Sequence, residues 1–263
     1  MLFRAQPDGY TRTMNIDLNA DAGESFGPWV LGNDAALFDS ISTVSVACGF
    51  HAGDPLTMRT TLELARDKGV QVGAHPGYPD LVGFGRRIMA ASDEEVHADV
   101  LYQIGALEGF SRLVGTPLRH VKAHGALSTR AWQDAQTARA VAQATLDWNA
   151  NLPLVVLPGT HLETEALKLG VKTVIEAFPE RAYLGNGQLA PRSMAGSSIH
   201  DPRKAATRAV MMVSQGRIGT IDGGWFELRP QTLCIHGDNP NAVEIARHVR
   251  AALEAEGIQI AGF

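Results

Sequence analysis

Strand-like and helical segments alternate along almost the whole chain, and this alternation restricts the possible folds more than any other feature of the sequence. Strands that are separated by helices form βαβ units, whose strands pair in parallel. Seven such strands in a chain of about 250 residues favour a closed or nearly closed barrel, so we predict an α/β fold of the (β/α)7 type. The strand-like runs are MNIDLNA (14–20), STVSVAC (42–48), GVQVGAH (69–75), LRHVKAH (118–124), LPLVVLP (152–158), VKTVIEAF (171–178) and QTLCIHG (231–237).

A doubly wound open sheet is the alternative fold for this pattern. It is disfavoured because no G-x-G-x-x-G motif follows the first strand-like run, and no G-x-x-x-x-G-K-[ST] motif occurs in the chain. Residues 1–13 carry no hydrophobic periodicity, so we predict a mobile N-terminal extension there. Residues 14–263 contain no linker, repeat or low-complexity segment, which predicts a single barrel domain.

Composition and charge narrow the class of partner. Hydrophobic residues make up 45% of the chain and charged residues 19%, as in ordinary soluble proteins. The net charge of -5 and the lack of a Lys/Arg block argue against nucleic acid or an anionic membrane as the main partner. No apolar run approaches the ~20 residues of a membrane span, and the N-terminus lacks a signal-peptide core, so we predict a cytoplasmic protein. Cys48 and Cys234 end strand-like runs and are predicted to be buried free thiols.

Helix start signals follow several of the predicted strands. Ser92 with Glu95 and Thr160 with Glu163 match the S/T-x-x-E capping box. Asp-Pro or Asn-Pro pairs at 54–55, 201–202 and 239–240 predict three further N-caps, each followed by proline in the first turn. The first capping box opens a helix that is predicted to bury one face, formed by Val96, Val100, Ile104 and Leu107.

Polar and ionisable side chains gather where the predicted strands end. Such groups are costly to bury unless they are paired, coordinated or hydrated, so their concentration at one end of a barrel predicts a functional site there. Simpler roles are expected for two residues, with Asp54 as a helix cap and His120 as a solvated residue at a strand edge. The strand-end residues are Asp17, Asn19, Asp21, His51, His75, Lys122, His124, Glu176, His236 and Asp238.

A series of motifs in these segments resembles the LamB/YcsF family, whose members act as the A subunit of prokaryotic 5-oxoprolinase. Together the motifs extend over nearly all of the chain after residue 13, and several motifs in one order are far more specific than any one alone. They are DLNADAGE (17–24), ACGFHAGDP (47–55), GAHPGYPD (73–80), FGRR (84–87), VKAHGAL (121–127), EAFPERAY (176–183) and CIHGDNP (234–240).

The resemblance implies a barrel like that of glycoside hydrolases and deacetylases. It also implies ATP-dependent opening of the lactam ring of 5-oxo-L-proline to L-glutamate, with ATP, accompanied by magnesium, as co-substrate. Two partner subunits, B and C, are implied as well. The chain departs from the family pattern at Ala123 and Ser128, where members commonly read VKPHGALYN, and at Asn186, where an Asp-Gly pair is common.

The reaction implied by the resemblance suggests roles for the strand-end residues. A lactam is an unreactive amide, so we expect Lys122 to stabilise negative charge on oxygen and Asp21, Glu24 or His124 to activate water. Arg192, in the irregular stretch 179–200, is a candidate to bind the substrate carboxylate. The remaining candidates for substrate binding are Asp17, Asn19, His51, His75, Glu176, His236 and Asp238.

Two other functions remain open from the sequence. The first is a metal-dependent hydrolase, for instance an amide or carbohydrate deacetylase, with a divalent ion held by Asp21, His51 and His75 and water in an open position. The second is a non-catalytic subunit that binds the lactam and delivers it. The missing phosphate-binding motifs also predict that a partner subunit handles ATP.

Overall fold

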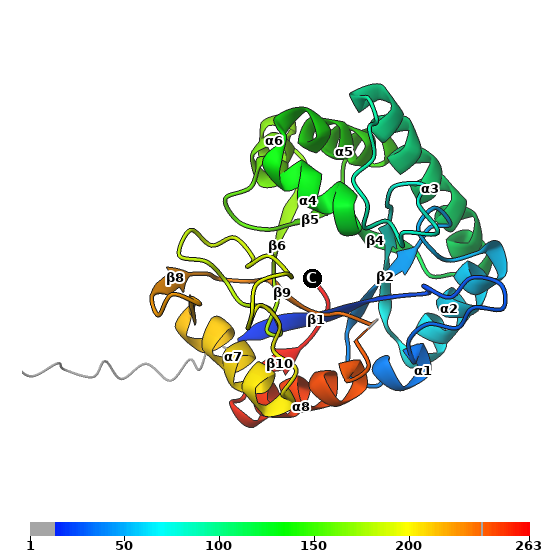
Figure 1. Ribbon diagram of the computed structural model, residues 1–263. Coiled ribbons are helices and arrows are strands. Elements are labelled where there is room, and N and C mark those ends of the chain that lie inside the picture. The colour runs from blue at the N-terminus through cyan, green and yellow to red at the C-terminus, as the bar shows by residue number, and fades with distance from the viewer. Residues whose placement is uncertain (1–13, 238) are drawn as a thin grey trace, which may run out of the picture.

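The computed structural model describes residues 14–237 and 239–263, and a closed barrel of parallel strands lies at its centre (Figure 1). Seven strands form the barrel in the order β1-β2-β3-β4-β5-β6-β9, and pairing of β9 with β1 closes it. The barrel strands are β1 (Asn15–Ala22), β2 (Thr43–Ala47), β3 (Gln71–His75), β4 (Leu118–Val121), β5 (Leu154–Val156), β6 (Thr173–Ala177) and β9 (Thr232–Ile235). The predicted barrel is therefore confirmed, and each predicted run contains one of these strands.

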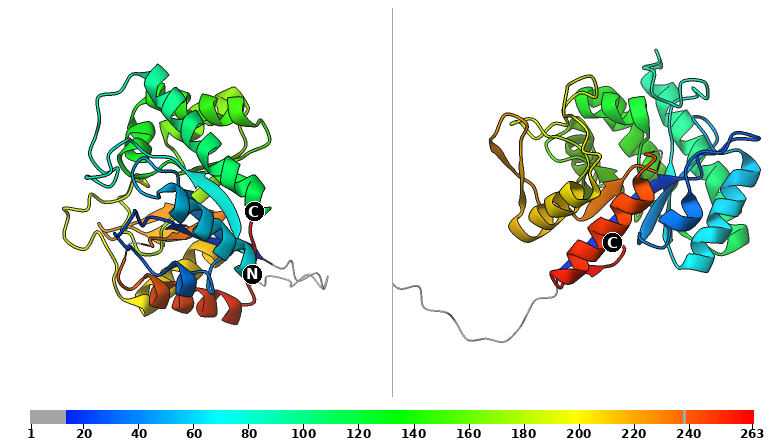
Figure 2. Two further views of the ribbon diagram at one scale, coloured as in Figure 1. Left: turned by 90° about the vertical axis from the view of Figure 1, so that its right-hand side faces the viewer. Right: turned by 60° about the horizontal axis from the view of Figure 1, so that its bottom comes forward.

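Helices surround the barrel on its outer side, as the two views of Figure 2 also show. They are α1 (Asp34–Leu37), α2 (Pro55–Lys68), α3 (Asp93–Val114), α4 (Gly125–Gln133), α5 (Ala135–Trp148), α6 (His161–Leu169), α7 (Pro202–Gln215) and α8 (Ala242–Ala255). Along the part of the chain that the structure describes, no helix is both long and apolar enough to cross a membrane.

Three short strands escaped the sequence analysis. β7 (Arg217–Gly219) and β8 (Trp225–Glu227) form an antiparallel hairpin, and β10 (Gln259–Ile260) pairs with the start of β1. Each has three residues or fewer, too few to show a period of two. The chain ends at the amino-terminal end of the barrel, where the ring of Phe263 lies 5.3 Å from the ring of His120. The predicted extension at 1–13 lies outside the described residues.

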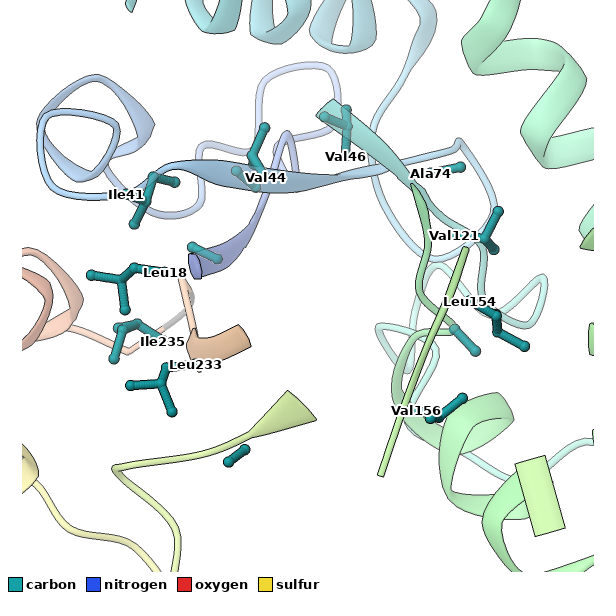
Figure 3. Packing of buried hydrophobic residues seen from close by; sticks show 14 of the residues in the cluster. Leu18, Ile41, Val44, Val46, Ala74, Val121, Leu154, Val156, Leu233 and Ile235 are labelled. Carbon is teal, nitrogen blue, oxygen red and sulfur yellow. The ribbon is translucent and has the colours of Figure 1, made fainter. Parts of the chain in front are cut away.

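The hydrophobic core lies between the strands and the helices. Along β1, Leu18 and Ala20 face outward and are fully buried, whereas Asp17 and Asn19 face inward. Figure 3 shows the apolar side chains of the barrel strands pointing away from the space that the strands enclose. The barrel interior is thereby left to polar residues.

Most of the predicted helix starts are confirmed. Ser92 forms the complete capping box with Glu95, and the predicted face of α3 is buried. Thr160, Asp54 and Asp201 cap α6, α2 and α7. The prediction for Asn239 is wrong, because α8 begins only at Ala242 and its N-cap is Asn241. Asn239 accepts a hydrogen bond from the Asn241 amide, so the Asn-Pro pair forms a turn before the helix.

The prediction of a solvated His120 is also wrong. This residue is 1% exposed, and its Nε2 atom lies 2.9 Å from Ser45 Oγ inside the barrel. Gly73 on β3 provides the space, since a Cβ atom there would lie 2.4 Å from the imidazole ring. Period two therefore continues inward from His120 to Lys122 and His124.

Candidate active site

The carboxyl ends of β1 to β4 bring most of the predicted site residues together. Asp21 lies in β1 and His75 ends β3, while Glu24 and His51 follow β1 and β2. His124 is the N-cap residue of α4, just after β4. All except Asp21 are less than 9% exposed, and the Asp21 side chain is 12% exposed. The site is thus a largely buried polar pocket at the end of the barrel where parallel strands place their active sites.

Asp17 lies deepest in the polar interior. Its carboxylate accepts hydrogen bonds from Ser42 at 2.6 Å, from Thr43 at 2.8 Å and from Thr232. Burial raises the pKa of Asp17 to about 6, although these hydroxyl groups oppose the shift. Because its partners all belong to the barrel wall, we assign Asp17 to support of the site, in place of the substrate contact that the sequence suggested.

We expect Asp17 to make the stability of the chain dependent on pH. A carboxyl group whose folded pKa is about 6 and whose ordinary pKa is 3.8 binds its proton more tightly in the folded state. The free energy of unfolding should therefore fall as the pH rises from about 4 to about 6, by up to roughly 3 kcal/mol. In Asp17→Asn this decrease should be absent. Urea unfolding at pH 4 to 7 measures it, with the exposed Asp67→Asn as control, and parallel curves for Asp17→Asn and the unmodified chain would contradict the assignment.

Lys122 occupies the next layer of the interior. Its Nζ atom lies 2.8 Å from both Asp21 and Glu176, 3.0 Å from Asn19 Oδ1 and 3.1 Å from Cys234 Sγ. Burial alone would lower the pKa of Lys122, but Asp21, Cys234 and Glu176 outweigh it and hold the pKa well above its usual value. An ammonium group has three protons, so protein acceptors already occupy all of them.

Asp21 connects this layer to the imidazole groups above it. One carboxylate oxygen binds Lys122, and the other lies 3.4 Å from His75 Nε2. Burial alone would raise the pKa of Asp21, but the charges of His75 and Lys122 hold it well below its usual range. Asp21 is therefore ionised at neutral pH and retains lone pairs that can accept a proton.

Three imidazoles and one carboxylate form the outermost layer. The rings of His51 and His124 stack with centroids 3.7 Å apart, and His75 meets both edge-on. Glu24 Oε1 lies 3.5 Å from His51 Nε2 and 3.7 Å from His124 Nδ1. Burial is the main reason why the pKa of His124 is lowered to about 3 and that of His51 is held well below its usual value. Both rings are therefore neutral at physiological pH.

These four residues could hold a metal ion, because they offer donor atoms that all lie within 4.8 Å of one another. The set differs from the expected Asp21, His51 and His75. Asp21 forms its short contact with Lys122, whereas Glu24 and His124 join the two histidines.

The loop after β3 covers the imidazoles, and the sequence analysis missed its contribution. Phe84 packs edge-on against the rings of His51 and His124, and its carbonyl oxygen accepts a hydrogen bond from His124 Nε2 at 2.8 Å. Its φ of 54° lies in the left-handed region, which a bulky residue rarely adopts. The FGRR motif that contains Phe84 was the available signal. Arg86 of the same motif lies over the Phe84 ring at 5.0 Å.

His236 and Arg192 lie apart from this cluster. His236 Nδ1 forms a short contact with Glu180, a residue that the sequence analysis did not single out although it lies in the EAFPERAY motif. Arg192 is exposed, and with burial its charge helps to lower the pKa of the neighbouring Arg181 to about 10. Arg181 donates to the carbonyl groups of Ala190 and Ser197 and thereby holds the 179–200 loop. Asp238 lies outside the described residues.

Comparison with known families identifies the chain. The model of the LamB/YcsF family matches residues 16–263. The chain belongs to the LamB/YcsF family. This agrees with the motifs of the sequence, six of which lie on the barrel strands or at their carboxyl ends.

Relatives in the LamB/YcsF family are similar over nearly their full length. The 5-oxoprolinase A subunit of one Thermus thermophilus strain is 58% identical over 250 residues, which cover 95% of this chain and 100% of the relative. That of Deinococcus radiodurans is 52% identical, with 95% and 98% covered. The crystal structure of the lactam utilization protein from another Thermus thermophilus strain matches with a TM-score of 0.93 at 57% identity, covering 95% of this chain and 100% of that chain.

The structure locates the positions where this LamB/YcsF chain departs from the expected family motifs. Ala123 is buried, and the Ser128 amide donates to the His124 carbonyl group in the first turn of α4. Asn186 is exposed and closes a turn by accepting a hydrogen bond from the Gln188 amide. Cys48 and Cys234 are buried free thiols, as predicted, although Cys234 also contacts Lys122.

Proposed function

We propose that this chain is the lactam-opening subunit of an ATP-dependent 5-oxoprolinase, which converts 5-oxo-L-proline to L-glutamate while ATP becomes ADP and phosphate. The observation that carries the proposal is the buried pocket in which the ionised Asp21 lies beside neutral imidazoles. Such groups suit proton transfer to and from water at an amide carbon. The names and high identity of the relatives support the choice of substrate.

ATP supplies what the pocket alone lacks. Transfer of its terminal phosphoryl group to the lactam oxygen makes the ring carbon more electrophilic. Water then adds to this carbon and gives its proton to a base, and the ring nitrogen leaves with a proton as the amine of glutamate. A second water molecule releases phosphate from the resulting acyl phosphate, so the atoms balance.

We assign the base to Asp21 or Glu24, with His124 as the group that passes the proton on. The neutral ring of His124 can accept a proton at Nδ1 because its Nε2 atom donates to the Phe84 carbonyl oxygen. Lys122 acts as a positioning residue that keeps Asp21 ionised, since protein acceptors occupy its ammonium group. The exposed Arg192 remains our candidate for the substrate carboxylate.

We further propose that two other subunits, B and C, complete the enzyme in the cytoplasm and that ATP, with magnesium, binds mainly to them. The name of the relatives designates one lettered subunit of an enzyme, and neither common phosphate-binding motif follows a strand in the chain where it would be expected. The alternative of a non-catalytic lactam carrier fits less well, because a carrier has no need of paired acid and base groups.

Coupling to ATP tests the proposal. We expect the complete complex to form glutamate and phosphate from 5-oxoproline in a ratio of one to one, and to form no glutamate without ATP. Measurement of both products over time provides the ratio, and a complex that contains the exposed-site variant His161→Ala serves as control. Rapid formation of glutamate without ATP would instead support a hydrolase that works unaided.

A further inference from the structure

The imidazole layer of the pocket has an arrangement that hydrogen bonding within the protein does not explain. Glu24, His51, His75 and His124 come from four separate segments of the chain, yet their donor atoms lie within 4.8 Å of one another. All four residues are buried, with exposed fractions of 8%, 0%, 1% and 4%. Polar groups that converge in this way need partners, because a buried polar atom without one is costly.

Hydrogen bonds to backbone carbonyl groups define the tautomers of two of the rings. His75 Nδ1 lies 2.7 Å from the Lys122 carbonyl oxygen, and His124 Nε2 lies 2.8 Å from the Phe84 carbonyl oxygen. A carbonyl oxygen can only accept, so the hydrogen of each neutral ring is on the nitrogen that faces it. The other nitrogens, His75 Nε2 and His124 Nδ1, each present a lone pair.

Those two lone pairs face each other across 3.0 Å. Two acceptors at this separation repel unless a proton or a cation lies between them or near both. A carbonyl group that fixes the outer nitrogen of an imidazole while the inner nitrogen faces a common point is also the usual support of a metal-binding histidine.

His51 distinguishes a cation from a proton. Its side chain is fully buried, and neither ring nitrogen has a hydrogen-bond partner among the residues that the structure describes. A proton shared by His75 and His124 would leave His51 without a partner. An ion that all three rings coordinate would provide one, and Glu24 Oε1, 3.5 Å from His51 Nε2, would complete the set.

The covering loop is shaped for this cluster. Gly85 has a φ of +63°, and a Cβ atom there would lie 2.7 Å from both His51 and His124. Only glycine lets the backbone approach the stacked rings this closely. The same loop supplies the Phe84 carbonyl group that orients His124.

We propose that Glu24, His51, His75 and His124 form a binding site for one first-row divalent metal ion of the zinc class. Three imidazoles and one carboxylate match the nitrogen and oxygen ligands of such ions, whereas magnesium and calcium prefer all-oxygen sites. Cys48 is not a ligand, because its thiol donates to the Val46 carbonyl group. When bound, such an ion would polarise a carbonyl group or a water molecule beside Asp21.

Metal binding by the full chain tests the inference separately from 5-oxoproline turnover. After treatment with a chelator, the chain should take up about one equivalent of Zn²⁺ by calorimetry and elemental analysis. Its melting temperature should rise by on the order of 5–10 °C when zinc is in large excess over the dissociation constant. X-ray absorption of the loaded chain should show nitrogen or oxygen neighbours at about 2.0–2.2 Å and no sulfur at about 2.3 Å.

Variants connect the binding to these residues. His51→Ala removes a ring that has no hydrogen bonds to lose, so it should fold and bind zinc at least ~100-fold more weakly. Glu24→Gln keeps the shape of the side chain and should weaken binding at least ~10-fold, which provides a second test if His51→Ala does not fold. The exposed-site control His161→Ala should bind as the unmodified chain does. Failure of the unmodified chain to bind zinc, or equal binding by Glu24→Gln and the control, would overturn the inference, and the former would indicate a shared proton.

Discussion

The purified chain alone is expected neither to open 5-oxoproline nor to hydrolyse ATP at a measurable rate, and addition of both partner subunits should restore glutamate and phosphate formation together. The pocket has acid and base groups but nothing that we assign to ATP. Without phosphorylation the lactam stays an unreactive amide. The change from no measurable turnover to full turnover is the largest effect that we predict.

The assay compares the isolated chain, the two partners together and the complete mixture at equal concentrations. Each is supplied with 5-oxoproline, ATP and magnesium, and both products are followed. Phosphate formation by the two partners alone, without glutamate, would assign ATP to them as proposed. Efficient ring opening by the isolated chain with ATP would contradict the assignment and indicate a nucleotide site built from loop amides or helix N-termini.

Lys122→Met should lower the turnover of the complete complex at least ~10²-fold, the lower range for loss of a positioned electrostatic or acid-base group. Without the ammonium group, Asp21 and Glu176 are two buried carboxylates with no counter-charge, so the pKa of Asp21 should rise and the base should be lost. The fall should be in kcat, with KM changed much less. His124→Ala should lower turnover by a similar factor, because it removes the group that passes the proton on.

Stability must be separated from catalysis in this experiment. Removal of one partner from a buried ion pair costs about 3–5 kcal/mol, so Lys122→Met should also unfold more easily. The double variant Lys122→Met with Glu176→Gln removes one of the unpaired carboxylates and should recover part of the stability without recovering turnover. Lys204→Met, at an exposed position of α7, is the matched control. A stable double variant with near-normal turnover would show that Lys122 only supports the fold.

Local periodicity was enough to predict the architecture. Apolar and polar residues alternate along β1, so Asp17, Asn19 and Asp21 were expected on one face before any contact was known. The capping box at Ser92 and the helical period after it predicted the buried face of α3 in the same way. These features depend on residues only a few positions apart, which is why the sequence contains them.

The partners of each polar group could not be predicted in this manner. Lys122 meets Glu176, which is 54 positions away, and Cys234, which is 112 positions away. The predicted charge stabilisation by Lys122 therefore became a positioning role only once these contacts were known. His120 was assigned to a solvated edge because its sequence neighbours do not reveal that Gly73 opens a space for it inside the barrel.

The sequence by itself determined the strands, the helices and the end of the barrel at which the polar residues lie, because each follows from a short repeating pattern. Only the tertiary structure decided that Glu24 and His124 join His51 and His75, that Asp21 pairs with Lys122, and that the Phe84 carbonyl group orients His124. The physical reason is that barrel closure and strand register bring these side chains together. Contacts made in this way join residues that are distant in the chain, so no local pattern records them.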